Sequence, residues 1–230
     1  TIIELFSLSP NAPGVLVTES SRYIGYFSAR EMIEVVHEQN LISARDQNPL
    51  TRLPGNYRIN EFIAQILENR NEAVVAYFDF DHFKPYNDYY GFRNGDRAIL
   101  LFTELMHKTL STEFFKGHIG GDDFFMGTLL HDSVTFKSVC EQIERLIYKF
   151  IDEVREFYNP DDRERGFILT EDREGNTKEF KLLSVSAVVI HLGTASTHIS
   201  GEHLQQLFAQ EKKRAKKSPS HISVIHTRES

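Results

Sequence analysis

Two acidic stretches of the sequence carry residue types that bind metal ions. Asp79 lies in the apolar run AVVAYFDF, and Asp122 and Asp123 follow two glycines in FFKGHIGGDDFFMG. Mg²⁺ is usually held by one or two carboxylates together with phosphate oxygens and water. Gly120 and Gly121 allow a tight turn and a close approach of phosphate to the backbone. The residue types therefore favour a metal-and-phosphate site, provided that the fold brings Asp79 and Asp122 together.

Each of these motifs also has a simpler structural interpretation. A Gly-Gly-Asp-Asp sequence is often a plain hairpin turn, and Asp79 alone could cap the end of a strand. Asn94, Gly95 and Asp96 could form the cap and first turn of the next helix. The functional interpretation is favoured because the predicted fold, described next, brings these residues to one edge of its sheet.

The hydrophobic pattern predicts how these residues are positioned. Apolar runs predict strands at 73–80, 114–119, 123–130, 182–192 and 222–226. Helical periodicity predicts helices at 57–69, 94–110, across the apolar positions from Phe136 to Val154, and at 201–217. The order strand, helix, strand, strand, helix, strand is that of ferredoxin-like folds. We therefore predict an α+β domain with a βαββαβ core, whose mainly antiparallel sheet is flanked by helices.

This topology has a geometric consequence for the acidic groups. A right-handed crossover makes the first two strands parallel, and the third strand lies antiparallel between them. The end of the first strand and the turn between the second and third strands then share one edge of the sheet. Asp79 is therefore expected close to Asp122.

The composition argues against several classes of protein. The net charge of −7 is unlike the dominant basic surface of nucleic-acid binders, so any phosphate must be bound locally. Cys140 is the single cysteine, which excludes an internal disulfide and fits a reducing compartment. No apolar run approaches the roughly 18 to 20 residues of a membrane span. We expect a cytoplasmic domain without nucleic-acid or membrane partners, and the start without Met suggests a piece of a longer chain.

Three motifs resemble those of a known family. DFDHFKPYNDYYGFRNGD followed by GGDDF resembles the GGDEF family of diguanylate cyclases, and NPLTRLPGN is similar to the motif that opens that domain. The similarity covers residues 48 to about 226. It implies condensation of two GTP molecules into cyclic di-GMP with release of two pyrophosphates. Because each domain would hold one GTP, turnover would need a homodimer of facing domains.

The resemblance implies which residues bind the metal and the base. Asp79 and Asp122 would ligate Mg²⁺, or Mn²⁺ in its place, together with the carbonyl oxygen of Phe80. Asn87 and Asp96 would hydrogen-bond the guanine edge and so select GTP over ATP. A bound metal would lower the pKa of the attacking 3′-hydroxyl.

The same resemblance implies which residues meet the phosphates. Phe83 and Lys84 would lie against them, next to the backbone of Gly120 and Gly121. Lys216 occupies the place of a phosphate-binding lysine and would offset charge on the triphosphate. The implied catalytic residues are Asp79, Asp122, Asp123 and Lys216.

Two departures from the family pattern leave a second function open. Asp123 stands where the family has Glu, and Ser220 stands where a second phosphate-binding cation is common. A carboxylate that is one methylene shorter costs on the order of 10²-fold in rate if positioning is critical. The alternative to an active cyclase is a catalytically degenerate domain that binds GTP and regulates an attached EAL phosphodiesterase.

The N-terminal residues resemble part of another module. GVLVTESSRYIGYF predicts two strands, and a capping box of Ser28 and Glu31 predicts a helix from about Ala29 to Asn40. This piece is similar to the second half of a CBS module. We assign 1–47 to that CBS-like extension with its linker and 48–230 to the GGDEF domain.

A polar segment before the penultimate strand predicts an extra hairpin. Its turn is expected near Glu174 and Gly175. Such a hairpin is similar to that of GGDEF domains that follow EAL and CBS domains. We therefore expect EAL and CBS domains as neighbours in the full chain.

Overall fold

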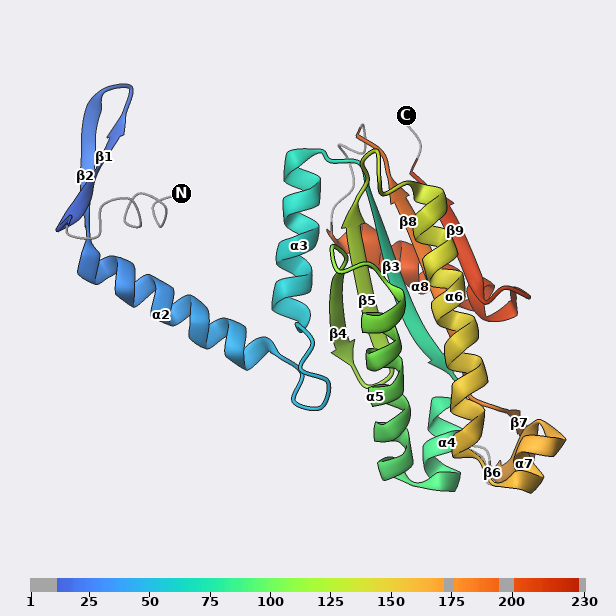
Figure 1. Cartoon of the computed structure of the whole chain (residues 1–230). Coiled ribbons are helices and arrows are strands. Elements are labelled where there is room, and N and C mark those ends of the chain that lie inside the picture. Colours follow the sequence, from blue (N-terminus) through green and yellow to red (C-terminus); the bar gives the residue numbers. More distant parts are fainter. Residues whose placement is uncertain (1–11, 172–175, 195–200, 228–230) are drawn as a thin grey trace. The chain divides into compact units, whose positions relative to one another are not determined.

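The chain divides into two compact units, and the boundary between them falls between Asp46 and Gln47 (Figure 1). The computed structural model describes residues 12–171, 176–194 and 201–227. The predicted turn near Glu174 and Gly175 lies outside the described residues. The two units are described separately below.

The first unit is a hairpin followed by a helix. β1 (Gly14–Glu19) pairs antiparallel with β2 (Arg22–Ser28), and α2 (Ala29–Asp46) follows directly. The predicted capping box is confirmed: the backbone N–H of Ser28 donates to Glu31 Oε2 at 2.8 Å, and that of Glu31 donates to Ser28 Oγ at 3.2 Å. Each side chain thus satisfies an N–H that the first turn leaves without a helical partner.

α2 is longer than predicted. It continues past Asn40 to Asp46, through part of the segment that we expected to be a linker. No Gly or Pro stands between these two residues, so nothing in the sequence stops the helix before Pro49. The assignment of 1–47 to a CBS-like module stays a prediction.

The second unit is built on a five-stranded sheet in the order β4-β5-β3-β8-β9. Its strands are β3 (Ala73–Asp81), β4 (Phe115–Gly120), β5 (Asp123–Leu129), β8 (Ser184–Leu192) and β9 (Ile222–His226). Every neighbouring pair is antiparallel except β8 and β9. The predicted ferredoxin-like core is confirmed, because β5 lies between the mutually parallel β3 and β4, and β9 extends the sheet beyond β8.

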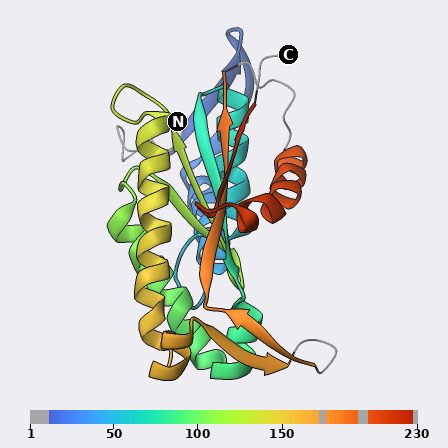
Figure 2. The ribbon, with the colours of Figure 1, turned by 90° about the vertical axis from the view of Figure 1, so that its right-hand side faces the viewer.

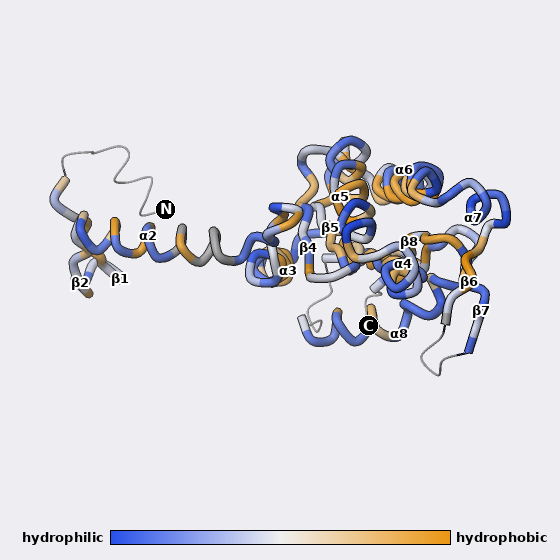
Figure 3. The backbone as a smooth tube through the Cα atoms, turned by 90° about the horizontal axis from the view of Figure 1, so that it is seen from below, coloured by the Kyte–Doolittle hydropathy of each residue, from blue (hydrophilic) through white to orange (hydrophobic). Residues whose placement is uncertain are grey.

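Both faces of the sheet are covered by helices (Figures 1 and 2). The helices are α3 (Asn56–Asn69), α5 (Phe92–Thr109), α6 (Phe136–Val154) and α8 (Gly201–Lys217). One core contains side chains of α5 and α6, and the other contains side chains of α3 and α8. Figure 3 shows α5 and α6 on one side of the sheet and α8 on the other.

β3 supplies side chains to both cores in alternation. Val74, Ala76 and Phe78 pack with α5 and α6, whereas Ala73 and Val75 pack with α3 and α8. Side chains alternate between the two faces of a strand with a period of two. The apolar run of β3 is continuous because both of its faces are buried.

One helix was not predicted. α4 (Phe83–Tyr90) follows β3 after a single residue, and it ends at Gly91, whose φ is +84°. The hydrophobic pattern predicted no helix for this stretch, which contains Pro85. Proline is tolerated in the first turn of a helix, where its missing N–H has no helical partner. α5 accordingly starts at Phe92, two residues before its predicted start.

An insertion between α6 and β8 forms the extra hairpin. A short 3₁₀ turn, η1 (Arg155–Phe157), leads to α7 (Pro160–Arg165). β6 (Phe167–Glu171) then pairs antiparallel with β7 (Thr177–Lys181). Among the described residues, no helix is both long enough and apolar enough to cross a bilayer.

Candidate active site

The two acidic stretches meet at one edge of the sheet. Asp79 near the end of β3 is the register partner of Asp123 at the start of β5. The turn before Asp123 contains Gly120 and Gly121, with φ of +150° and +57°. Residues other than glycine rarely adopt such backbone conformations. The turn therefore places Asp122 beside Asp79, as the topology predicted.

The closeness of these carboxylates shows in the acidity of Asp122. Burial, and then the negative charge of Asp79, raise the pKa of Asp122 to about 6. A like charge disfavours ionisation, and an added cation favours it. The pair is therefore a place where a divalent cation would lower the free energy of the ionised state.

The donors fit Mg²⁺ only with help from other oxygens. Among the described residues, no group of three or more His, Cys, Asp or Glu side chains is arranged to hold a metal. Two carboxylates suffice for Mg²⁺, which usually completes its shell with phosphate oxygens, backbone oxygens and water. Phe80, whose carbonyl oxygen is the predicted third ligand, follows Asp79 and buries its side chain in the core of α5 and α6. Its role stays a prediction.

Two lysines of α8 reach these carboxylates. Lys212 Nζ lies 2.7 Å from Asp79 Oδ1 and 3.2 Å from Asp123 Oδ1. Lys216 Nζ contacts Asp79 Oδ2 and lies 3.1 Å from Asp81 Oδ1. Residues four apart lie on the same face of a helix, so both ammonium groups point toward β3. Burial opposes their charge, but hydrogen bonds and attraction from Asp79 outweigh it and raise the pKa of both lysines.

Asp81 fixes the end of β3. Its side chain is buried and accepts hydrogen bonds from Ser186 Oγ at 2.6 Å and from Ser184 Oγ at 3.0 Å. His221 Nδ1 lies 3.6 Å from Asp81 Oδ2. Asp81 therefore joins β3, β8 and the segment after α8, and it holds Lys216 in place.

Sequence reasoning missed both Asp81 and Lys212. The signals were present: Asp81 is two residues after Asp79 on one strand, and Lys212 is four residues before Lys216 on one helix. These spacings put each pair on one face of its element. Which lysine of α8 meets which carboxylate of β3 depends on how α8 packs on the sheet, and these spacings do not specify that packing.

The predicted guanine-binding residues come from neighbouring helices. Asn87 is on α4, and its side-chain oxygen is buried without a hydrogen-bond partner among the described residues. A Cβ on Gly95 of α5 would overlap that oxygen, so Asn87 lies directly against Gly95. Asp96, the next residue along α5, is exposed. The structure thus brings Asn87 and the start of α5 together and leaves Asp96 open to solvent.

Phe83 and Lys84 form the first turn of α4. The ring of Phe83 packs edge-on against Phe80, 5.6 Å between centroids, so this side chain belongs to the core. His82 precedes the helix with φ of +66° and provides no side-chain cap. The N–H groups of the first turn are suited to an anion. This turn therefore offers its backbone, along with the exposed Lys84 side chain, to a phosphate.

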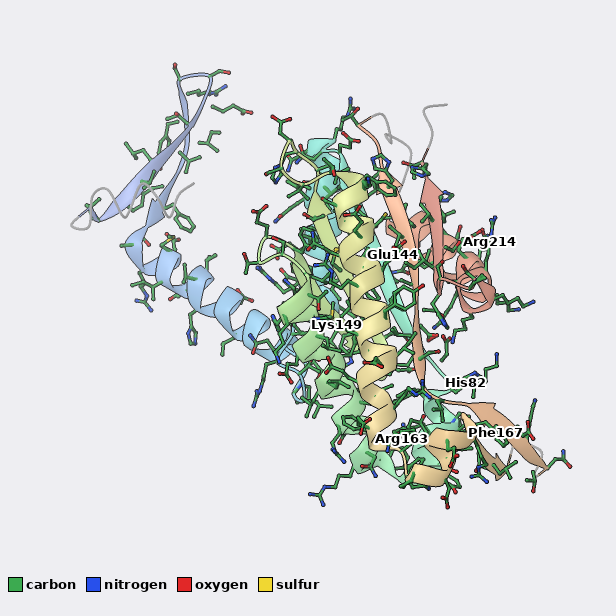
Figure 4. The ribbon with its side chains drawn as sticks, turned by 45° about the vertical axis from the view of Figure 1, so that its right-hand side comes forward. His82, Glu144, Lys149, Arg163, Phe167 and Arg214 are labelled. Atoms are coloured by element: carbon green, nitrogen blue, oxygen red, sulfur yellow. The ribbon has the colours of Figure 1, made fainter. Side chains whose placement is uncertain are left out.

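Two cavities adjoin the acidic corner. One of about 240 Å³ is lined by Asp79, Asp123 and Lys212 and by apolar residues of the sheet and α8. The other, of about 620 Å³, is lined by Asp81, His82, Glu179, Lys181, Leu182, Ser184, Lys216 and His221. Figure 4 shows His82 beside the base of the β6–β7 hairpin. Burial lowers the pKa of His82, and the charges of Lys216 and Lys181 lower it further against the attraction of Asp81.

A buried histidine contacts the glycine turn. His118 Nδ1 lies 3.0 Å from Thr51 Oγ1, and Nε2 lies 3.0 Å from the carbonyl oxygen of Gly121. An Nε2–H tautomer satisfies both bonds, with Gly121 and Nδ1 as acceptors. The ring also stacks on Phe124 at 4.3 Å. Sequence analysis did not single out His118, which joins the segment before α3 to the turn that carries Asp122.

The fold and site define an α+β domain with a ferredoxin-like sheet and an acidic turn at one edge. The chain belongs to the GGDEF family, because the profile described as "Diguanylate cyclase, GGDEF domain" matches residues 45–167, more than half of the chain.

The relatives of this chain include proteins of Escherichia coli (strain K12). Diguanylate cyclase DgcP is 26% identical over 145 residues, which are 60% of this chain and 42% of that protein. Probable diguanylate cyclase DgcC is 30% identical over 124 residues, which are 49% of this chain and 32% of that protein. The chain thus spans less than half the length of either relative.

Solved structures share the fold. The GGDEF domain of DgcB from Caulobacter crescentus, in complex with c-di-GMP, is 18% identical with a TM-score of 0.55, covering 78% of this chain and 95% of that one. The S helix-GGDEF-EAL structure of Vibrio cholerae LapD, bound to c-di-GMP, is 15% identical with a TM-score of 0.58, covering 85% of this chain and 40% of that one. At these identities the likeness shows the fold alone.

Proposed function

We propose that this chain binds GTP at the acidic edge of the sheet and that two copies condense two GTP molecules into cyclic di-GMP and two pyrophosphates. The observation that carries the proposal is the meeting of Asp79 and Asp122 with Lys216 of α8 at one edge. Membership of the GGDEF family and the diguanylate cyclases among the relatives support it. The product assigns the chain to cyclic di-GMP signalling.

The acidic pair would hold the metal ion, and Lys216 would offset charge on the triphosphate. Asp79 and Asp122 would hold Mg²⁺ together with the carbonyl oxygen of Phe80, and the bound ion supplies positive charge and lowers the pKa of the 3′-hydroxyl. Lys216 lines the cavity of about 620 Å³ and presents its ammonium group at the same edge. Positioning and charge balance account for most of catalysis in phosphoryl transfer, and these residues provide both.

The guanine would be selected between α4 and α5. The side-chain amide of Asn87, whose oxygen is buried, can bond the base edge, and Asp96 can accept from the N–H groups that guanine carries and adenine lacks at the same position. A site built to bond such groups rejects an analogue without them, because its own polar groups are left unpaired. GTP is therefore the proposed substrate.

The reaction needs two domains. The 3′-hydroxyl oxygen of one GTP forms a bond to the α-phosphorus of the other, and the bond from that phosphorus to the bridging oxygen breaks, so that pyrophosphate leaves. The hydroxyl proton passes to a carboxylate of the site, for which Asp123 is our candidate. Two such steps close the ring. Since one domain holds one GTP, the active species is a two-fold homodimer.

A second candidate function has its own supporting observation. Lys212 binds both Asp79 and Asp123, so the carboxylate proposed to accept the proton is already in an ion pair. Ser220 is uncharged and lies 2.9 Å from the hydroxyl of Ser218. A domain that binds GTP without turnover and regulates an attached EAL phosphodiesterase is consistent with both. CBS and EAL neighbours and a cytoplasmic location, where GTP is available, belong to either proposal.

One assay separates the two functions. The purified chain at high concentration is incubated with GTP and Mg²⁺ for hours, and cyclic di-GMP is measured. Product that disappears in an Asp79→Ala variant supports the cyclase. Tight GTP binding without product, even when dimerisation is forced by a fused dimer, contradicts it and supports the regulatory domain. Asp123→Glu then tests whether the shorter carboxylate limits the rate.

A further inference from the structure

The β6–β7 hairpin is a part of the second unit to which the proposed mechanism assigns no task. β7 ends at Lys181, and β8 begins three residues later at Ser184. Ser184 is the register partner of Asp81. Chain continuity therefore places the end of β7 at the same edge of the sheet as the acidic corner, where Figures 2 and 4 show the hairpin.

The hairpin supplies one wall of the larger cavity. Glu179 and Lys181 both line the cavity of about 620 Å³, as two residues with a spacing of two on one strand face do. Phe180 between them packs against the core of α5 and α6, and its ring lies 6.3 Å from that of His82. This anchor fixes which face of β7 is directed to the cavity.

The cations around this edge differ in their partners. Lys212 and Lys216 are both paired with carboxylates of β3. By contrast, within the described part of the chain, no carboxylate lies within ion-pair distance of Lys181. An exposed ammonium group at the wall of a cavity of this size is free to meet an anion, and volumes of roughly 300 to 1,000 Å³ are those of small-ligand sites.

We propose that Lys181 binds the terminal phosphates of the nucleoside triphosphate in the cavity that Lys216 also lines, and that Glu179 weakens this binding by repulsion. The inference rests on the proposed function, since it assigns a subsite to the same GTP. Lys216 is shared by the acidic corner and the cavity, so a triphosphate bound at the acidic corner and in contact with Lys216 would reach the cavity that Lys181 lines.

The test uses the whole chain, with Mg²⁺, and two ligands. The first is a GTP analogue with a methylene bridge between the α and β phosphates, which cannot be turned over, and the second is GMP, which lacks the outer phosphates. Isothermal titration gives both dissociation constants for the wild type, Lys181→Ala, Glu179→Gln and Lys178→Ala. Lys178 is the matched control, because its Nζ lies over the Phe180 ring at 5.9 Å and does not line the cavity.

Lys181→Ala is expected to weaken binding of the analogue roughly 3- to 10-fold and to leave GMP binding unchanged, as for one charge contact near solvent. Glu179→Gln should tighten binding of the analogue, and Lys178→Ala should change neither constant. Equal effects of Lys181→Ala and Lys178→Ala on the analogue, or equal effects of Lys181→Ala on both ligands, contradict the inference alone. A wild-type chain that does not bind the analogue contradicts the proposed function and this inference with it.

Discussion

The side-chain oxygen of Asn87 occupies the space that a Cβ atom on Gly95 would need. This contact lets α5 pass close to α4, and the Asn87 oxygen is buried without a hydrogen-bond partner among the described residues. The absence of a side chain at position 95 is therefore tied to the proposed guanine site rather than to the backbone, since Gly95 is not among the glycines with positive φ.

Gly95→Ala should separate binding from stability. Only the end of the Asn87 side chain must move, and alanine is favoured over glycine within a helix by about 1 kcal/mol. We expect unfolding in urea to need the same or a higher denaturant concentration, while GTP affinity falls roughly 10-fold through the displaced amide. Asn87→Ala is the control, and the double variant should show no further loss. Unchanged GTP affinity in Gly95→Ala would show that this amide does not contact the base.

Asp122→Asn should stabilise the metal-free chain. Burial and Asp79 hold the pKa of Asp122 at about 6, above its ordinary value near 4. The folded state therefore retains a proton that the unfolded state has lost, and wild-type stability falls as pH rises from about 4 to 6. At pH 7.5 the variant should gain about 1 to 2 kcal/mol in free energy of unfolding, discounted for solvent screening.

This gain should vanish below about pH 4, where Asp122 is protonated in both states. Saturating Mg²⁺ should also reverse the order, because a ligand that binds only the folded state stabilises it and the variant lacks a ligand for the ion. Asp132→Asn, at an exposed position, is the control. A variant that is no more stable than the wild type at pH 7.5 would contradict the repulsion between Asp79 and Asp122.

His118→Ala should destabilise the second unit. The change removes a buried ring stacked on Phe124 and leaves the Thr51 hydroxyl and the Gly121 carbonyl without their partner. A cost of about 2 to 4 kcal/mol is expected in urea unfolding. His107→Ala, at an exposed position of α5, should cost little.

The same variant should change the response to acid. Burial lowers the pKa of His118, so the unfolded chain takes up a proton first and stability is lost as pH falls below about 6.5. Unfolding curves between pH 7.5 and 5 should therefore show a smaller loss in His118→Ala than in the wild type. Equal losses in the two proteins would assign the acid sensitivity to other groups.

Asp162→Ala should loosen the insertion from α4. The buried carboxylate accepts hydrogen bonds from the hydroxyl of Tyr90 on α4 and from the side chain of Asn159, and it pairs with Arg165. Burial alone would raise the pKa of Asp162, but these bonds outweigh it and lower the pKa. Because the remaining Arg165 side chain is partly exposed to water, the expected cost is that of the lost hydrogen bonds, about 1 to 3 kcal/mol, and weaker GTP binding should accompany it because α4 also carries Asn87. Asp161→Ala, which alters an exposed neighbour, should preserve both properties.

The sequence predicted most of the sheet because the relevant signals are local. The continuous apolar run from Ala73 and the two runs around Gly120 and Gly121 require buried strands. The order of elements then leaves few topologies, and right-handed crossover puts Asp79 beside Asp122. α4 was missed because its Pro85 is a breaker in most positions and is tolerated only in a first turn.

The sequence by itself determined the class of fold and the edge at which the acidic residues meet, because these follow from periodicity and element order, and the resemblance of its motifs indicated the family. Only the tertiary structure decided the partners at that edge: Lys212 with Asp79 and Asp123, Asp81 with two serines, and His118 with the carbonyl oxygen of Gly121. The physical reason is that side chains on different elements meet according to how α8 and the segment before α3 pack on the sheet, and a spacing along one element does not specify that packing.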